Sequence, residues 1–402
     1  MKITGNPLFN YFLYHTLNPV QKNSRTWETP VPVNRKNLRN EEDIFISHGD
    51  YFSSVHSFLA KNRCEIITSA VSLLADRDVK TEDIKEINVC LEKHGEFYHP
   101  ARVEVCADRT KFLFVVNAAF SSAGKNGIEK EYNILKRLNN EYPYSFIPKI
   151  YGEGRACLNK SLEIRMFMGE WFEGYNEFHL SHSPLESEEI KAQKKIIVWD
   201  TEKGNYFLSK EKTMELYEQT SMILTSYYNF ETFEQIFPWH HGAGDFVVRA
   251  CNDKTDLKLI TVRGYFSLVQ TPNGDPEAIL GAMLLFLLNL SIRMRLDRLD
   301  GIGDIAWSED IAVEGTVKGF FRGLALQSQA GLLPDQFDVF FRNYLSSCTL
   351  PDLSDLFSNV VNTYNPAAPE LPIIKQNLKN HTDILYRFIN PESCSRSEKC
   401  KG

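Results

Sequence analysis

The segment from Trp239 to Val248 carries the side chains best suited to chemistry in this chain. It reads Trp-His-His-Gly-Ala-Gly-Asp-Phe-Val-Val, and an apolar stretch expected to form a strand follows at 257–263. Imidazoles exchange protons near neutral pH, and a carboxylate beside a buried strand needs a donor or a cation to offset its desolvation. Arg263 is a natural donor for Asp245. The segment therefore predicts proton transfer, ion pairing or metal binding at one loop.

Three roles are open to the adjacent imidazoles of His240 and His241. One of them can act as a general base, because a neutral imidazole accepts a hydroxyl proton. Together with Asp245 they can bind a transition metal, although the ligand set is incomplete and the spacing unspecific. The favoured role is structural, in which both rings hydrogen-bond the loop backbone and hold its shape.

Asp245 has two roles if it pairs with Arg263. The pair can replace a metal ion and hold a phosphate, or it can only lock the loop, and the second role is slightly favoured because ion pairs also occur away from active sites. Asp245 can also hold one Mg²⁺ ion, since that cation prefers oxygen ligands, but one carboxylate alone makes a poor site.

The residues before this loop predict a small antiparallel sheet with one helix. Near-continuous apolar and β-branched runs indicate strands covered on both faces. Apolar residues spaced by three and four positions indicate an amphipathic helix with one buried stripe. The strands are expected at 102–106, 111–120, 147–151 and 162–168, and the helix at 128–138.

Four short motifs in this order resemble the aminoglycoside phosphotransferase and choline kinase branch of the protein-kinase-like fold. The run from Phe114 to Asn117 stands where that family has the strand ending in its phosphate-pairing Lys, and 129–131 where it has the helix Glu that holds the Lys. The run 166–174 resembles the hinge that receives adenine, and Gly244-Asp-Phe-Val-Val resembles the end of the catalytic loop. The resemblance covers roughly residues 84 to 390.

The resemblance implies an α+β, two-lobed protein-kinase-like fold. A small antiparallel-sheet lobe with one helix would precede a larger, mostly helical lobe, and ATP with Mg²⁺ would bind in the cleft between them. The residues placed at this site are His240, Asp245 and Arg263 for catalysis, Asn117, Glu131, Met168, Glu170 and Trp171 for the cofactor, and Asp245 for the metal.

Several positions depart from the family's pattern. His240 stands in the place of the catalytic Asp, Asn117 in the place of the Lys, and Thr261 near the place of the metal-binding Asp. Phosphoryl transfer depends on positioning and on neutralising phosphate charge, so these changes predict a degenerate, pseudokinase-like protein that binds a nucleotide or another phosphorylated ligand. The alternatives are an active divergent phosphotransferase or nucleotidyl transferase using His240 and Asp245, and an interaction scaffold with an empty cleft.

Composition narrows the classes of protein and of binding partner that fit this chain. The chain has 402 residues, 43% of them hydrophobic and 24% charged, with a net charge of −7 and no extended basic run. This size predicts two or three lobes with large cores, and the acidic balance argues against nucleic acid or an anionic membrane as a partner. A small-molecule or nucleotide ligand is expected instead.

Cysteine usage and hydropathy predict a cytoplasmic protein. The eight cysteines are scattered, with no Cys-x-x-Cys pair, which argues against a disulfide framework or a cysteine-built zinc site. The N-terminus shows no secretory pattern. The longest apolar stretch, 278–288, is too short to span a bilayer and indicates a buried helix.

The expected domain organisation has four parts. Residues 1–83 form an N-terminal extension, first an extended arm and then a helix over 51–75, which could dock a protein partner. Residues 84–175 form the small domain, 176–390 the large lobe with its loop at 239–263, and 391–402 a polar tail. Helices of the large lobe are expected at 214–228, 276–299, 311–328, 335–347, 352–363 and 379–389, and 181–195 forms a surface crossover.

Three smaller motifs are interpreted mainly as structural features. His94 and His99 lie where a kinase has its glycine-rich loop and could meet an anion, but a polar hairpin loop with two exposed histidines is favoured. The triplet at 48–50, His-Gly-Asp, imitates a catalytic-loop signature without its context. The run 301–304, Gly-Ile-Gly-Asp, is expected to be a turn that ends a helix.

Overall fold

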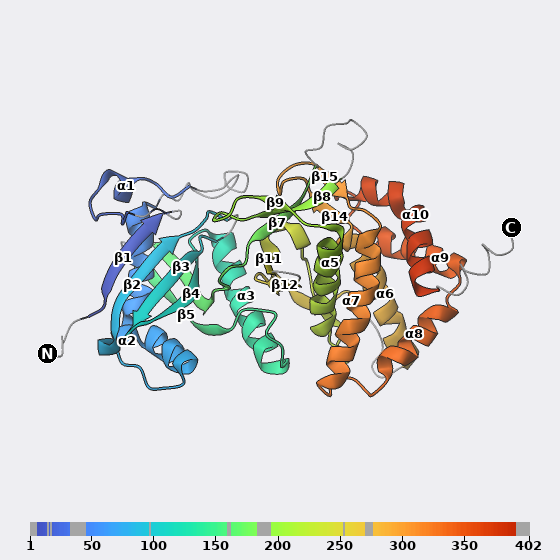
Figure 1. Ribbon diagram of the computed structural model, residues 1–402, viewed down its shortest axis with the longest axis horizontal. Coiled ribbons are helices and arrows are strands. Elements are labelled where there is room, and N and C mark those ends of the chain that lie inside the picture. The colour runs from blue at the N-terminus through green and yellow to red at the C-terminus, as the bar shows by residue number, and fades with distance from the viewer. Residues whose placement is uncertain are drawn as a thin grey trace. The chain divides into compact units, whose positions relative to one another are not determined.

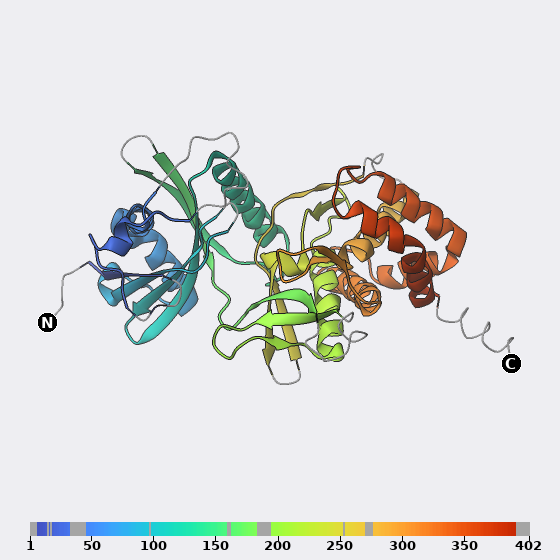
Figure 2. The ribbon, with the colours of Figure 1, turned by 90° about the horizontal axis from the view of Figure 1, so that it is seen from above.

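The computed structural model divides the chain into two compact units. The first consists of residues 1–141 and 148–173, and the second of 142–147 and 174–402 (Figures 1 and 2). The structure describes residues 6–13, 16, 18–32, 46–95, 98–158, 162–182, 194–251, 254–269 and 276–390. The expected tail and most of the expected crossover at 181–195 lie outside these residues.

A six-stranded sheet forms the first unit, with the strand order β1-β2-β3-β4-β6-β5. β1 runs parallel to β2, and the other neighbours are antiparallel. Its strands are β1 (Leu8–Leu13), β2 (Ile84–Leu91), β3 (Ala101–Ala107), β4 (Thr110–Ala119), β5 (Ile150–Leu158) and β6 (Leu162–Glu170). Its helices are α1 (Arg25–Glu28), α2 (His48–Ala75), the short 3-10 helix η2 (Thr81–Asp83) and α3 (Ser122–Glu141).

The alternation of side chains along the strands separates two faces of this sheet. In β3 every second residue is buried, among them Val103 and Val105, and the residues between them are half-buried. The buried residues join α2 in one hydrophobic core. On the other face, Phe167 of β6 packs against Tyr132 of α3, with ring centroids 6.1 Å apart. The sheet is therefore covered by α2 on one face and by α3 on the other.

The start of α2 explains the His-Gly-Asp triplet. Ser47 is the N-cap and accepts from the backbone N–H of Asp50, while the Asp50 carboxylate accepts from the backbone N–H of Ser47. This reciprocal arrangement satisfies two otherwise unpaired donors at a helix start. The triplet belongs to a helix cap. The helix is interrupted at 61–64, where residues 62–64 have left-handed backbone angles.

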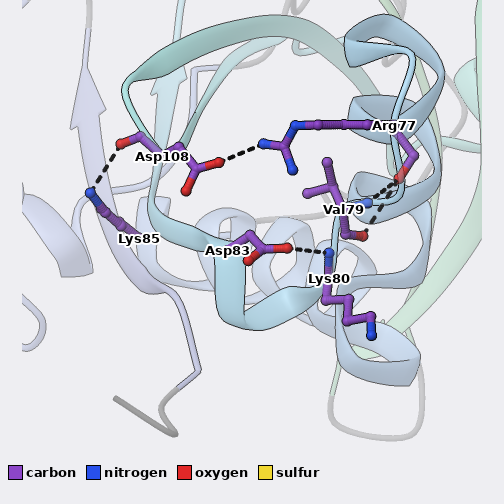
Figure 3. Close-up of polar contacts among 7 residues, drawn as sticks. Arg77, Val79, Lys80, Asp83, Lys85 and Asp108 are labelled. Atoms are coloured by element: carbon purple, nitrogen blue, oxygen red, sulfur yellow. Dashed lines mark hydrogen bonds and ion pairs between the residues drawn. The ribbon is translucent and has the colours of Figure 1, made fainter. Parts of the chain in front are cut away.

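Polar contacts fasten the far end of α2 to the sheet (Figure 3). Arg77 pairs with Asp108 in the β3–β4 turn, with Nη2 2.5 Å from Oδ2. Lys85 of β2 donates to the Asp108 carbonyl at 3.0 Å, and the Asp83 carboxylate accepts from the backbone N–H of Lys80 at 2.9 Å. The Arg77 contact joins the segment that follows α2 to the β3–β4 turn, the Lys85 contact joins β2 to the same turn, and the Asp83 contact is local to η2.

The N-terminal extension contributes to the core of the first unit. Tyr11 of β1, Trp27 of α1 and Phe52 of α2 belong to the same buried cluster as the strands β2 to β4. The rings of Tyr11 and Trp27 meet edge to face at 5.5 Å. The described residues of this extension therefore pack with the sheet in one unit.

The second unit combines helices with short strands. Its strands are β7 (Glu177–His182), β8 (Lys194–Trp199), β9 (Tyr206–Phe207), β10 (Glu234–Ile236), β11 (Phe246–Cys251), β12 (Lys254–Leu259), β13 (Tyr265–Ser267), β14 (Leu296–Arg298) and β15 (Ile305–Trp307). Its helices are α5 (Lys210–Ser226), the π-helical turn η3 (His241–Asp245), α6 (Pro276–Met294), α7 (Ile311–Gln329), α8 (Phe337–Ser347), α9 (Leu350–Asn362) and α10 (Leu371–Ile389). The α+β fold class is confirmed, with an antiparallel-rich sheet unit followed by a mostly helical one.

Glycines allow α5 and α7 to pack closely. A Cβ atom added at Gly315, Gly319 or Gly323 would lie within 2.7 Å of an atom of α5. The Ser221 hydroxyl donates to the Thr316 carbonyl at 2.7 Å across this contact. Residues four apart lie on one side of a helix, so these glycines form one stripe along α7.

α6 is the apolar helix that the sequence indicated. Its stretch Glu277–Met294 is long and apolar enough to cross a membrane, and 67% of that stretch is buried inside the protein. A core helix passes the same test. α6 ends before the expected boundary, because residues 296–298 pair with β15 as β14.

The run 301–304 is therefore the turn of a β-hairpin, in contrast to the helix-ending turn that we expected. Gly301 has a φ of +76° there, a backbone conformation in which glycine lacks the steric cost of a side chain.

Candidate functional site

The turn η3 holds the side chains that the sequence singled out. It lies between Trp239, which is buried, and β11, and Gly244 within it has a φ of +77°. This left-handed angle suits glycine and turns the chain so that Asp245 points back toward the start of the loop. The Asp245 carboxylate accepts from the backbone N–H of His240 at 2.8 Å.

Asp245 and Arg263 form the ion pair that the sequence indicated. The Asp245 side chain is fully buried, and its Oδ2 contacts Nη1 of Arg263. The Arg263 side chain remains 38% exposed. The backbone carbonyl of Asp245 accepts from Ile260 at 2.7 Å. Asp245 thus joins the loop to the end of β12, and its buried charge is offset by a guanidinium.

His240 is exposed at this loop. Its pKa is lowered to about 3, by desolvation from the surrounding protein and by the positive charges of Arg293 and Arg263. Because the His240 side chain is exposed, the positive charges of Arg293 and Arg263 account better for its lowered pKa than desolvation does. The imidazole is therefore neutral at physiological pH, and its low basicity makes it a weak proton acceptor.

His241 is buried beneath the loop. Its Nε2 donates to the Met294 carbonyl at 3.1 Å, and its ring lies edge-on to Tyr217 with centroids 5.5 Å apart. Burial lowers its pKa to about 4, opposed by the bond to Met294. His241 is a neutral buried residue that contacts the backbone of α6, and its predicted role in holding the loop remains a prediction.

Asp297 supports the loop and was missed from the sequence. A Cβ atom added at Gly242 would lie 2.1 Å from Asp297 Oδ2, so η3 rests directly on this carboxylate. Asp297 also accepts from the backbone N–H groups of Leu180 and Arg298, at 2.8 and 2.7 Å. Desolvation raises its pKa to about 6, against these hydrogen bonds. Its place in the short strand β14, inside a stretch that reads as helix, concealed it.

The side chains around Asp245 do not fit a Mg²⁺ ion. Magnesium requires several oxygen ligands in near-octahedral geometry, whereas the Asp245 carboxylate accepts from Arg263 and from the backbone of His240. No group of three or more His, Cys, Asp or Glu side chains is placed to hold a metal ion among the residues that the structure describes. The charge of Asp245 is instead neutralised by the guanidinium of Arg263.

In the first unit, Asn117 and Glu131 belong to the same side of the sheet. Asn117 of β4 is half-buried and lies opposite Phe167 of β6. Glu131 belongs to α3, which packs on β4 and β6, and it is 2% exposed. Their predicted roles beside a phosphate remain predictions.

Met168 lies on the opposite face of the sheet. It is opposite Val116, and both are fully buried in the core with α2. Alternate residues of a strand point to opposite faces, and Phe167, the partner of Asn117, lies on the other face. The Met168 side chain presents no surface to a ligand, and the predicted role of this residue toward adenine remains a prediction.

Glu170 and Trp171 follow at the end of β6 and are half-buried. The Glu170 carboxylate accepts from the backbone N–H of Lys149 at 3.2 Å. Arg102 of β3 lies 6.0 Å from the Trp171 ring centroid, at the limit of cation–π attraction. Their roles toward a nucleotide base likewise remain predictions.

The two histidines of the 93–100 loop differ from the expected exposed pair. His99 is 5% exposed, stacks on Phe120 at 4.7 Å and lies with Nδ1 3.0 Å from Nδ1 of His94. The Tyr51 hydroxyl donates to the His99 carbonyl at 2.7 Å. Burial, with the neighbouring imidazoles, lowers the pKa of His99 to about 3. This loop folds inward because Phe120 and Tyr51 offer partners that local composition does not reveal.

The two units and their element order define an α+β protein. No protein-family model matches the sequence, and no curated protein does. Among solved structures, the chain is similar to one titled "WaaP in complex with acyl carrier protein", with 11% identity over 64% of this chain and 86% of that chain, and a TM-score of 0.26. A likeness of this size carries no argument about fold or activity.

Proposed function

We propose that this protein is a degenerate kinase-like protein that binds a nucleotide or another phosphorylated ligand, with the loop of Asp245 and Arg263 as its anion-recognising element. The observation that supports this proposal is the ion pair itself. Arg263 is held by a fully buried carboxylate and keeps 38% of its side chain exposed. A guanidinium fixed in this way recognises phosphate oxygens through charge-assisted hydrogen bonds.

The geometry supports binding over phosphoryl transfer. Transfer needs a base near the acceptor and cations that neutralise the developing charge. The low pKa of His240 makes it a weak base, and Asp245 is engaged by Arg263. A ligand held here would therefore bind without requiring Mg²⁺.

Thermal unfolding of the full-length protein tests this proposal. A ligand that binds only the folded state raises the melting temperature, so ATP should raise it equally with Mg²⁺ and with a chelator. The Arg263→Gln variant should lose this increase. Arg249→Gln is the matched control, because Arg249 forms a surface pair with Asp256 at 3.1 Å in the neighbouring hairpin, and it should retain the increase.

The opposite pattern would favour the active phosphotransferase. In that case ATP would stabilise the protein only with a divalent cation, and labelled ATP would be consumed in a reaction that disappears in Asp245→Asn and His240→Gln. An absence of any ATP effect in the wild-type protein would contradict nucleotide binding.

A further inference from the structure

The strand β5 leaves one side of its backbone without a partner strand. It is the last strand of the six-stranded sheet, where it pairs with β6 alone among the residues that the structure describes. It has nine residues, and none of residues 151–158 takes part in a described backbone hydrogen bond outside the β5–β6 pair. At the opposite edge, the Tyr11 carbonyl of β1 accepts from the backbone N–H of Val20 at 2.7 Å. An unpaired edge of this length is a template for another strand.

Two opposite charges project from this edge on the face that carries α3. Glu153 and Arg155 are both exposed, and 73% of the Arg155 side chain is accessible. Glu153 lies opposite Phe167 of β6, which packs against α3, and residues two apart on a strand share a face. Charged residues at a sheet edge commonly discourage pairing. A row that contains one acid and one base is, however, complementary to a copy of itself.

The other face of β5 offers no bulky side chain to a second strand. Residues 152, 154 and 156 are Gly, Gly and Ala. A Cβ atom added at Gly154 would lie 2.7 Å from the Phe58 ring of α2, so this face already rests on the helix. A strand placed beside β5 would meet small residues there. Recognition at this edge therefore comes from the backbone and from the charged row.

Charge selects one register for a pair of antiparallel β5 strands. In such a pair, directly opposite residues point to the same face of the sheet and interact. A pairing centred on Gly154 places Glu153 of each copy opposite Arg155 of the other, which gives two pairs of opposite charge. A pairing centred on Glu153 would place two glutamates opposite each other, and one centred on Arg155 would do the same with two arginines. Like charges directly opposite are destabilising, so the register centred on Gly154 is favoured.

We propose that two copies of this chain associate through β5, antiparallel and centred on Gly154, and form one continuous sheet. Both copies use the same strand, so the interface is two-fold symmetric. A recess of about 240 Å³ adjoins the strand on the face of α3, with Tyr132, Glu153 and Arg155 among its lining residues. Arg155 of the second copy would lie beside Glu153 at the rim of this recess. The proposal concerns the first unit alone and is independent of the function proposed for Asp245.

Sedimentation velocity of the full-length protein over a range of concentrations tests the association. The wild-type protein should pass from monomer to dimer as its concentration rises. Glu153→Arg and Arg155→Glu should each raise the Kd of the dimer about tenfold, because both cross-strand pairs change from attraction to repulsion. The double variant Glu153→Arg/Arg155→Glu should return the Kd to near the wild-type value, since the pairs are restored in the opposite order. Lys203→Glu, at an exposed position in the β8–β9 turn, should leave the Kd unchanged.

The melting temperatures of these variants should stay near that of the wild-type protein. Arg155 forms a surface pair with Glu163 at 3.4 Å, and exposed pairs of this kind contribute little to stability. A change in the Kd would then report on the interface and not on folding.

Hydrogen exchange locates the interface without any substitution. At protein concentrations above the Kd, peptides that cover 150–158 should exchange more slowly than below it, whereas peptides that cover β1 should not change. Four results would overturn the proposal: a wild-type protein that stays monomeric at every accessible concentration, single variants that dimerise as well as the wild type, a double variant as weak as the single ones, or concentration-dependent protection that is absent from 150–158.

Discussion

The carboxylate of Asp245 is fully buried and contacts the guanidinium of Arg263 and the backbone of His240. The sequence predicted the ion pair, because a carboxylate before a buried strand needs a cation and Arg263 stands two residues beyond the expected metal position. The burial of individual loop side chains could not be predicted from the sequence. His99 and Asp297 are both buried through contacts with distant segments, which no local pattern records.

Buried neutral histidines should make the protein sensitive to acid. His381 is fully buried, and desolvation with the charge of Arg295 lowers its pKa from 6.5 to about 3. Between these values the unfolded chain binds a proton that the folded protein does not, so the free energy of unfolding falls as pH falls below about 6.5, by up to about 1.4 kcal/mol per unit. The raised pKa of Asp297 has the opposite effect, since the contribution of this carboxyl group to the free energy of unfolding falls as pH rises toward about 6.

Urea denaturation at pH values between about 7 and about 5 measures how much His381 contributes to this loss of stability in acid. His381→Gln should show a shallower fall in the free energy of unfolding than the wild-type protein, by about 1 kcal/mol per pH unit. His182→Gln, at an exposed position, should keep the wild-type slope. Identical slopes for His381→Gln and the wild type would contradict the assignment.

At the scale of elements, periodicity predicted most of the helices and the strands of the first sheet. The expected strand at 162–168 appears as β6, and the expected helix at 311–328 appears as α7. Periodicity predicts which face of an element is buried but not its partner. The glycines of α7 were therefore unexplained by the sequence, and their role became clear only with α5 beside them.

Substitutions at glycine separate close packing from helix propensity. Gly319→Ala should lower the free energy of unfolding by about 3 kcal/mol, because its Cβ atom would lie 2.0 Å from the Glu218 carbonyl oxygen of α5. Gly281→Ala in α6 meets no atom within 4 Å and should raise it by about 0.5–1 kcal/mol, since alanine favours helices. Equal effects at the two positions, measured by urea denaturation, would show that α5 and α7 tolerate separation.

At the scale of the whole molecule, the chain passes between the two units more than once. Residues 142–147 follow α3 of the first unit but belong to the second. There Tyr142 contacts the Tyr265 hydroxyl at 2.8 Å, and Phe146 accepts from the backbone N–H of Leu259 at 2.9 Å. The expected small domain at 84–175 includes this segment, because its expected strand at 147–151 runs into β5, and contiguity along the chain does not reveal contacts with segments more than a hundred residues away.

Two tyrosines ten positions apart should report on different units. Tyr142→Ala removes a 6%-exposed ring from the second unit, and Tyr132→Ala removes an 8%-exposed ring from the first. Each change should cost about 3 kcal/mol of stability in its own unit. Hydrogen exchange should increase in β12 and β13 for Tyr142→Ala, and in β6 for Tyr132→Ala. Equal increases throughout both units for either variant would show that the molecule unfolds as one.

Because residues 142–147 belong to the second unit, they constrain the order in which the two units fold during synthesis. The aromatic side chains of Tyr142 and Phe146 leave the ribosome roughly a hundred residues before Leu259 and Tyr265, which at common translation speeds is on the order of 10 s. The first unit can close at residue 173 only by leaving this segment out. For that interval the nascent chain carries an uncovered aromatic strip, which a chaperone or the growing second unit must shield.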